Sequence, residues 1–335
     1  MDKVTIIGAT TWGTTLGMII AQNGIPVVLG TRTQDEADEL NSKRENSRFL
    51  SGFVFPRNLT ASADLKQALH DTNMLILAVP SSRFRDNVKG LVNYIDNNPI
   101  ILSASKGLEL NTSRRMSQIL QEELPEELCS KLCVLSGPNL ALEIAQGKIA
   151  STVVASTNMI LSQQVQQAIM SASFRIYTNE DVIGVELGGA LKNIIALGAG
   201  ISDGLGNGDN AKYAFITRGL TEITRLGVAA GASPLTFAGL AGLGDLIATC
   251  ASPLSRNRYV GEQLTKGKLL TEILSSMKNV AEGVHTTVAA LRLAKQLDVE
   301  MPITNIIYRI LYENVDPRQS RVELMNRPPR SESDA

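Results

Sequence analysis

The first half of the chain alternates short apolar runs with longer amphipathic stretches. Six runs are almost continuously apolar, which is typical of strands in a parallel sheet covered on both faces. These predicted strands are Val4–Gly8, Pro26–Gly30, Met74–Val79, Ile100–Ala104, Cys133–Ser136 and Ser151–Ala155. The amphipathic stretches predict helices between several of them, among them Gly13–Asn23, Ser81–Tyr94 and Thr112–Glu123. Strand–helix alternation requires right-handed crossovers, so the pattern predicts an α/β fold with a doubly wound, mostly parallel sheet.

The pattern changes near residue 180. Strand signals nearly vanish there, and helical periodicity continues to about Glu323. Fourteen of the 27 glycines lie between Gly184 and Gly244. Because a glycine inside a helix costs about 1 kcal/mol relative to alanine, we expect close helix–helix or helix–ligand approach here. The chain therefore divides into a predicted dinucleotide-binding domain (1–180), an all-helical substrate and catalytic domain (181–325) and a disordered tail (326–335).

Composition excludes several classes of function. A net charge of −1 and 4% aromatic residues argue against nucleic-acid binding. Cys129, Cys133 and Cys250 form no CxxC pair, which favours a reduced, cytoplasmic setting. With His70 and His285 as the only imidazoles, we expect no metal site. No stretch approaches the roughly 20 unbroken apolar residues of a spanning helix, so no membrane insertion is expected.

The first candidate site follows the first predicted strand. Gly8-Ala-Thr-Thr-Trp-Gly13 connects that strand to a helix, as in a dinucleotide-binding loop of the Rossmann type. Gly8 would form the tight turn and Gly13 would allow close helix–strand packing. Thr10 stands where such loops have their middle glycine. From these residues alone, an ordinary tight strand–helix turn is an equal alternative.

The end of the second strand bears on the choice of cofactor. Gly30-Thr-Arg-Thr33 has no carboxylate before Asp35, whereas an NAD-selective site usually places an acid here for the ribose hydroxyls. The Arg32 guanidinium and the Thr33 hydroxyl suit a 2′-phosphate instead. We therefore expect NADP to be preferred and NAD to be accepted, with a solvated loop arginine as the alternative.

The helical half contains candidates for proton transfer. Lys192 lies among small and apolar residues in Glu186–Ala196, and burial there would bring its pKa toward neutrality. Asp245 and Thr249 are four residues apart and share one helical face, so Asp245 is a candidate partner for Lys192. The alternative for Lys192 is a side chain that reaches the surface.

Three further segments carry polar groups at helix starts or strand ends. Ser255-Arg-Asn-Arg258 opens a helix, where hydroxyl, guanidinium and amide groups suit a phosphate, although N-capping by Ser255 explains it equally well. Lys106 and Gly137-Pro-Asn139 each follow a predicted strand, where open α/β sheets present ligands. Both segments read equally well as turns.

With these motifs the chain resembles the bacterial NAD(P)-dependent glycerol-3-phosphate dehydrogenases, from about Lys3 to Met325. The blocks that carry the resemblance include Trp12–Thr14, Ser105–Glu109, Leu135–Pro138, Gly184–Asn193, Gly206–Ala211, Ala241–Leu246, Ser252–Asn257, Val280–Val284 and Met301–Thr304. The resemblance implies reversible hydride transfer between NAD(P)H and dihydroxyacetone phosphate, which supplies sn-glycerol 3-phosphate for phospholipid synthesis. It implies a small-molecule substrate, and a homodimer built on the helical domain is a further expectation.

The resemblance also assigns residues to roles. The implied catalytic acid/base is Lys192, and the polar companions are Lys106, Asn193, Asp245 and Thr249. The implied substrate contacts are Lys106, Gly137, Asn139, Lys192, Asp245, Ser255, Arg256 and Asn257. The expected cofactor contacts are Gly8, Thr11, Trp12, Gly13, Arg32, Thr33, Lys106, Ala141, Arg256, Val280 and Glu282.

Three positions depart from the family pattern. Thr10 replaces the middle glycine, so the pyrophosphate would sit slightly farther off or rotate. Thr11 replaces the usual serine and keeps the hydroxyl, while Asn139 replaces a serine and adds bulk. Two alternatives stay open: a related two-domain dehydrogenase of the 3-hydroxyacid or 6-phosphogluconate type, and a cofactor-binding regulatory protein without catalysis.

Overall fold

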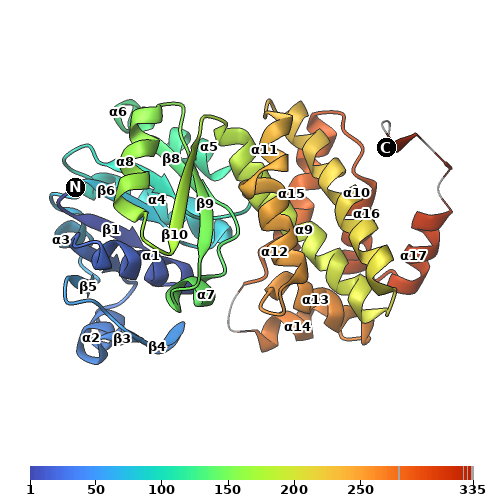
Figure 1. The fold of residues 1–335 in the computed structure, drawn as a ribbon, viewed down its shortest axis with the longest axis horizontal. Helices are drawn as coiled ribbons and strands as arrows, with labels where there is room; N and C mark the ends of the chain where they lie inside the picture. The colour runs from blue at the N-terminus through green and yellow to red at the C-terminus, as the bar shows by residue number, and fades with distance from the viewer. Residues whose placement is uncertain (278–279, 327, 330, 333–335) are drawn as a thin grey trace. The chain divides into compact units, whose positions relative to one another are not determined.

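The computed structural model describes residues 1–277, 280–326, 328–329 and 331–332. The chain forms two compact units, which Figure 1 shows as a ribbon. The sheet unit contains Met1–Lys106 and Arg115–Val182, and the helical unit contains Gly107–Arg114 and Ile183–Ala335. The tail predicted for 326–335 lies partly outside the described residues.

An eight-stranded sheet forms the centre of the sheet unit, in the order β10-β9-β8-β7-β6-β1-β2-β5. The strands are β1 (Val4–Ile7), β2 (Val27–Gly30), β5 (Leu59–Ser62), β6 (Met74–Leu77), β7 (Ile100–Ser103), β8 (Leu132–Ser136), β9 (Ala150–Ala155) and β10 (Phe174–Asn179). All neighbouring strands pair in parallel except β8 and β9, which pair antiparallel. The predicted doubly wound, mostly parallel sheet is confirmed.

The sequence pattern missed both edge strands. β5 is short and half polar, and β10 alternates buried Phe174 and Ile176 with exposed Arg175 and Tyr177. Such alternation is typical of a strand with one solvated face, unlike the continuous apolar runs that marked the inner strands. A short antiparallel hairpin of β3 (Glu45–Asn46) and β4 (Leu50–Val54) was also missed.

Helices cover both faces of the sheet. They are α1 (Thr11–Gln22), α2 (Gln34–Lys43), α3 (Leu65–Leu69), α4 (Phe84–Leu91), α5 (Met116–Glu123), α6 (Glu126–Cys129), α7 (Ala141–Ala145) and α8 (Met159–Ile169). Along β1, Val4 and Ile6 pack in one core with α1 and α8, whereas Ile7 packs in a second core with α4 and α5. Burial on both faces explains why these strands read as unbroken apolar runs.

The helical unit is built around α9 (Val182–Gly204). Its other elements are α10 (Gly208–Ala229), α11 (Pro234–Ala238), a π-helical turn (Leu240–Gly244), α12 (Asp245–Ala251), α13 (Arg256–Thr265), α14 (Leu270–Ser276), α15 (Glu282–Gln296), α16 (Pro302–Tyr312) and α17 (Pro317–Met325). By length and composition α9 could cross a membrane, but 83% of its most apolar window is buried in the protein. Burial of that extent is what a core helix of a globular protein shows.

Glycines allow two of these helices to touch backbone to backbone. A Cβ atom on Gly200 of α9 would lie 1.9 Å from the Arg258 carbonyl oxygen, and one on Gly261 of α13 would lie 2.0 Å from the Leu197 carbonyl oxygen. Neither position has room for a larger side chain. The close helix–helix approach predicted from the glycine density is confirmed.

Candidate functional site

The loop between β1 and α1 has the form of a dinucleotide-binding turn. Gly8 has φ +109°, and a Cβ there would lie 2.7 Å from the Ala78 carbonyl oxygen. A Cβ on Gly13 would lie 2.1 Å from the Gly8 carbonyl oxygen. The turn can therefore close only with glycine at both positions, as the sequence indicated.

Thr10 has a role that the sequence did not show. Its φ of −80° is accessible to any residue, so the backbone does not require the usual glycine. Its side chain is the N-cap of α1, since Oγ1 accepts a hydrogen bond from Gly13 N at 3.1 Å and donates one to the Ala78 carbonyl at 3.0 Å. Thr10 thus engages one of the amides that a helix start otherwise offers to an anion.

Asn46, in the β3–β4 hairpin, is hydrogen-bonded to the loop between β1 and α1 and to the first turn of α1. The residue is 2% exposed. Its Nδ2 donates to the Ala9 carbonyl at 2.9 Å and to Thr14 Oγ1 at 2.8 Å, while Thr11 Oγ1 donates to the Phe49 carbonyl at 3.1 Å. Sequence reasoning missed Asn46, because nothing local distinguishes it from a surface asparagine.

The end of β2 exposes the groups predicted to select the cofactor. The Arg32 side chain is 75% exposed, and Thr33 caps α2. Glu36 lies beside them: its carboxylate accepts from Arg32 N at 3.2 Å and lies 3.7 Å from Arg32 Nε. The sequence identified the cation but not this carboxylate, which the first turn of α2 brings back toward the strand end.

Other predicted groups of the sheet unit follow β7 and β8. Lys106 Nζ donates to the Gly137 carbonyl at 2.8 Å, so these two predicted residues do meet. Thr15 Oγ1 contacts the Ala141 carbonyl at 3.4 Å, which places Ala141 beside α1. Both polar atoms of the Asn139 amide and the indole nitrogen of Trp12 are buried without a hydrogen-bond partner among the described residues.

These observations test whether a dinucleotide fits the sheet unit. Buried amide and indole groups are normally hydrogen-bonded, so unsatisfied ones indicate a missing partner. The same unit contains a glycine turn that excludes any Cβ at the start of α1. The glycine turn and the unsatisfied Trp12 indole nitrogen therefore fit a bound dinucleotide.

In the helical unit, Lys192 is buried in a polar cluster. It is 6% exposed, so the alternative of a surface-reaching lysine is wrong. Its Nζ donates to Asp245 Oδ1 and, at 2.7 Å, to Thr249 Oγ1. Thr249 in turn donates to the Asp245 carbonyl at 2.7 Å. The predicted Lys192–Asp245 pair, with Thr249 on the same helical face, is present.

The π-helical turn positions Asp245. A Cβ on Gly188 of α9 would lie 2.6 Å from the Ala241 carbonyl, and one on Gly242 would lie 2.2 Å from the Phe237 carbonyl. The turn is therefore pressed against α9 just before α12 begins at Asp245. Single π turns of this kind are frequent at functional sites.

The start of α13 joins three helices. Asn257 Nδ2 donates to Asn193 Oδ1 at 2.9 Å, and Asn257 Oδ1 accepts from Gly283 N at 3.0 Å. Ser255 Oγ accepts from Arg258 N at 3.3 Å, so Ser255 does cap α13. The capping interpretation is therefore correct, and the predicted contact group Asn257 is fixed between Asn193 and α15.

Arg256 presents a cation at this helix start. More than a third of the residue is exposed, yet burial within the surrounding protein lowers the pKa of its guanidinium, and the Glu282 carboxylate acts in the opposite direction. Glu282 is the first residue of α15, and Val280 before it is 38% exposed. A partly desolvated arginine that ligands can reach is well suited to bind an anion.

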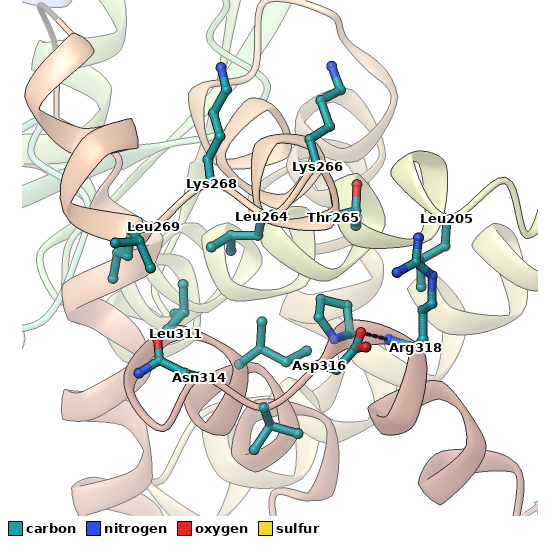
Figure 2. A pocket seen from close by; sticks show the side chains of 15 residues that line it. Leu205, Leu264, Thr265, Lys266, Lys268, Leu269, Leu311, Asn314, Asp316 and Arg318 are labelled. Carbon is teal, nitrogen blue, oxygen red and sulfur yellow. Dashed lines mark hydrogen bonds between the residues drawn. The ribbon is translucent and has the colours of Figure 1, made fainter.

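The helical unit also contains a cavity that is lined by other residues. This cavity of about 570 Å³ lies between the end of α13 and the α16–α17 connection, and its lining includes none of the predicted site residues. Figure 2 shows the side chains that line it. Within the described ranges, no group of three His, Cys, Asp or Glu side chains could hold a metal.

Comparison with known proteins gives the family. The model of the NAD-dependent glycerol-3-phosphate dehydrogenase N-terminus matches residues 3–162, and that of the C-terminus matches residues 181–321. This chain belongs to the NAD-dependent glycerol-3-phosphate dehydrogenase family. The resemblance stated from the sequence blocks is confirmed, and the match of both halves disfavours the 3-hydroxyacid and 6-phosphogluconate alternative.

Individual members of this dehydrogenase family match the chain over nearly its whole length. The chain is 53% identical over 326 residues (97% of this chain, 91% of the relative) to glycerol-3-phosphate dehydrogenase [NAD(P)+] of Dehalococcoides mccartyi. It is 47% identical over 335 residues (100% and 98%) to that of Bacillus thuringiensis. The crystal structure of glycerol-3-phosphate dehydrogenase from Coxiella burnetii superimposes with a TM-score of 0.92 at 38% identity, covering 97% of this chain and 99% of the other.

Proposed function

We propose that this chain catalyses reversible hydride transfer between NAD(P)H and dihydroxyacetone phosphate, with sn-glycerol 3-phosphate as the reduced product. The observation that carries the proposal is the buried Lys192 ammonium, bonded to Asp245 and Thr249. Reduction of a ketone needs a proton donor for the oxygen that becomes negative, and a held ammonium is such a donor. Membership of the glycerol-3-phosphate dehydrogenase family indicates that this ketone is dihydroxyacetone phosphate.

Lys192 transfers the proton in both directions. During reduction its Nζ gives a proton to the nascent alkoxide of the substrate, and during oxidation it takes the hydroxyl proton back. Asp245 stabilises the ammonium and fixes its direction, and Thr249 supplies a second acceptor on the same helical face. This preorganisation costs no rearrangement at the moment of reaction. Lys106 and Asn193 are the proposed polar companions.

The start of α13 binds the substrate phosphate in this proposal. The Ser255 hydroxyl, the Arg256 guanidinium and the remaining Asn257 amide proton all belong to the start of the ten-residue helix α13, which also offers its first backbone amides. Guanidinium groups and helix N-termini both favour phosphate. We call Ser255, Arg256 and Asn257 the phosphate clamp, with Gly137 and Asn139 as further proposed substrate contacts.

The cofactor supplies or accepts the hydride when bound. The residues proposed to hold it are Gly8, Thr11, Trp12, Gly13, Arg32, Thr33, Lys106, Ala141, Arg256, Val280 and Glu282. Arg32 and Thr33 favour NADP through its 2′-phosphate, and the Glu36 carboxylate beside Arg32 is an acceptor that a ribose hydroxyl of NAD can use. We therefore propose NADP as the preferred cofactor and NAD as an accepted one.

The wider setting is also a proposal. The scarce, unpaired cysteines favour the cytoplasm, and glycerol 3-phosphate produced there would enter phospholipid synthesis. A homodimer built on the helical domain remains part of the proposal.

The activity is tested with purified protein, NADPH and dihydroxyacetone phosphate. We expect NADPH absorbance to fall as an equimolar amount of glycerol 3-phosphate forms. No consumption of NADPH at millimolar substrate would overturn the proposal and would favour the non-catalytic regulatory alternative. Repeating the assay with NADH tests the Arg32 argument, which fails if NADH is clearly preferred.

A further inference from the structure

Four charged side chains of the helical unit form a network that the proposed mechanism does not use. Asp203, at the end of α9, accepts through one oxygen from Lys212 Nζ of α10 at 2.8 Å and from Arg258 Nε of α13 at 2.6 Å. Arg258 Nη2 also lies 2.7 Å from Glu262 Oε1. Asp203 therefore links three helices through two cations.

This network is shielded from solvent. The side chains of Lys212, Arg258, Asp203 and Glu262 are 10%, 19%, 21% and 26% exposed. Charge pairs at this depth are screened less by water and salt than surface pairs. Two cations balance two carboxylates, so neutralising Asp203 removes the carboxylate that Lys212 and Arg258 share and leaves Arg258 with Glu262. The network can therefore hold a fixed geometry.

Arg258 is restrained on three sides. Its backbone N–H is bound by Ser255, its carbonyl oxygen lies against Gly200, and its guanidinium is bound by Asp203. It directly follows Arg256 and Asn257 in the first turn of α13. A shift of Arg258 along α9 must carry these two clamp residues with it.

The same helix carries the proton donor. Lys192 and Asp203 are 11 residues apart on α9, which is close to three full turns, so both lie on one face about 16 Å apart. The Lys192–Asp245 pair and the Lys212–Asp203 pair both lie close enough to the buried Cys250 thiol to influence its pKa. α9 thus sets the spacing between the proton donor and the residue that anchors the phosphate clamp.

We propose that Arg258, through its ion pair with Asp203, is a positioning residue for the phosphate clamp, and that Lys212 holds Asp203 in place for it. Arg258 does not contact the substrate in this proposal. It fixes where Arg256 and Asn257 stand relative to Lys192. The inference rests on the proposed function, because it concerns binding of the phosphate of dihydroxyacetone phosphate.

The test is the kinetics of Asp203→Asn with dihydroxyacetone phosphate at saturating NADPH. Asparagine keeps the shape and one acceptor but removes the charge. We expect KM to rise about tenfold, as when a charge-assisted contact to phosphate is weakened, with kcat within about threefold of the wild type. General destabilisation would lower Tm and the active fraction, and hence kcat, without changing KM. Arg258→Lys keeps the charge and should raise KM less than Asp203→Asn.

Glu323→Gln is the matched control. It removes a different ion pair between two helices of this unit, in which Arg309 Nη1 binds Glu323 at 2.6 Å, and it should leave KM unchanged. An unchanged KM in Asp203→Asn, or an equal rise in the control, overturns this inference while wild-type activity leaves the proposed function intact. A wild type that does not reduce dihydroxyacetone phosphate overturns both.

Discussion

At the scale of single residues, the chemistry concentrates on one lysine. Lys192 is 6% exposed, and burying an ammonium is costly unless it is paired. Asp245 and Thr249 supply that pairing, and Asp245 is itself 1% exposed. With two histidines in the chain and neither among the predicted site residues, the proton-transfer role falls to this lysine.

Lys192→Ala tests that role. Removing a general acid costs about 10²–10⁴-fold in rate, so kcat should fall by at least two orders of magnitude. NADPH binding should persist, because the proposed cofactor loop lies in the sheet unit. Quenching of the protein's single tryptophan, Trp12, by added NADPH measures binding independently. Unchanged turnover would remove Lys192 from the mechanism.

Thr10 gives a second residue-scale prediction. Thr10→Gly removes the N-cap of α1 and releases the Gly13 N–H toward the pyrophosphate. We expect the free energy of unfolding to fall by a few tenths of a kcal/mol and NADPH to bind more tightly. Chemical denaturation and Trp12 fluorescence titration measure the two effects. Weaker NADPH binding in this variant would show that the Thr10 side chain supports the cofactor.

At the scale of elements, α16 depends on a carboxylate from another helix. Glu222 of α10 is 1% exposed and accepts from Ile303 N at 2.7 Å, from Thr304 N at 2.8 Å and from Thr304 Oγ1 at 2.7 Å. It therefore caps the start of α16 across the core. Burial raises the pKa of Glu222 above 4.5, and the hydrogen bonds from Thr304 and Ile303 partly oppose the shift.

Glu222→Gln should destabilise the helical unit in a pH-dependent way. Because the variant loses one hydrogen-bond acceptor, its free energy of unfolding should fall by about 1–3 kcal/mol. Since the folded state holds the Glu222 proton to higher pH than the unfolded chain, the stability from this group is complete below pH 4.5 and declines as pH rises through its raised pKa. Glutamine does not titrate, so the difference in the free energy of unfolding between wild type and variant should narrow as pH rises. Urea unfolding at several pH values measures it, and a constant or widening gap would contradict the assignment.

Local signals predicted some elements and not others. The inner strands were found because burial on both faces makes them continuously apolar, and α9 because its glycines and apolar residues follow a helical period. β10 and the β3–β4 hairpin were missed because one face is solvated or the segment is very short. Asn46, Asp203 and Glu222 were missed because each has a partner that is distant in sequence: Thr14 is 32 residues from Asn46, Arg258 is 55 from Asp203 and Thr304 is 82 from Glu222. Such partners carry no local pattern.

At the scale of the whole molecule, the net charge is close to zero, but the charged side chains are arranged in distinct groups. Lys192–Asp245 and Lys212–Asp203–Arg258 each pair cations with buried or half-buried carboxylates. Arg32 and Arg256 instead stay accessible, one in each unit. This distribution fits a protein that binds two anionic ligands, a dinucleotide and a phosphorylated three-carbon substrate.

The most direct test of this account traces the hydride itself. NADPH deuterated at both positions of the nicotinamide C4 is incubated with the protein and dihydroxyacetone phosphate, and the product is analysed by mass spectrometry. We expect glycerol 3-phosphate with one deuterium, at C2, because the hydride from the nicotinamide C4 adds to the ketone carbon. Glycerol 3-phosphate without deuterium, or no glycerol 3-phosphate at all, would contradict it.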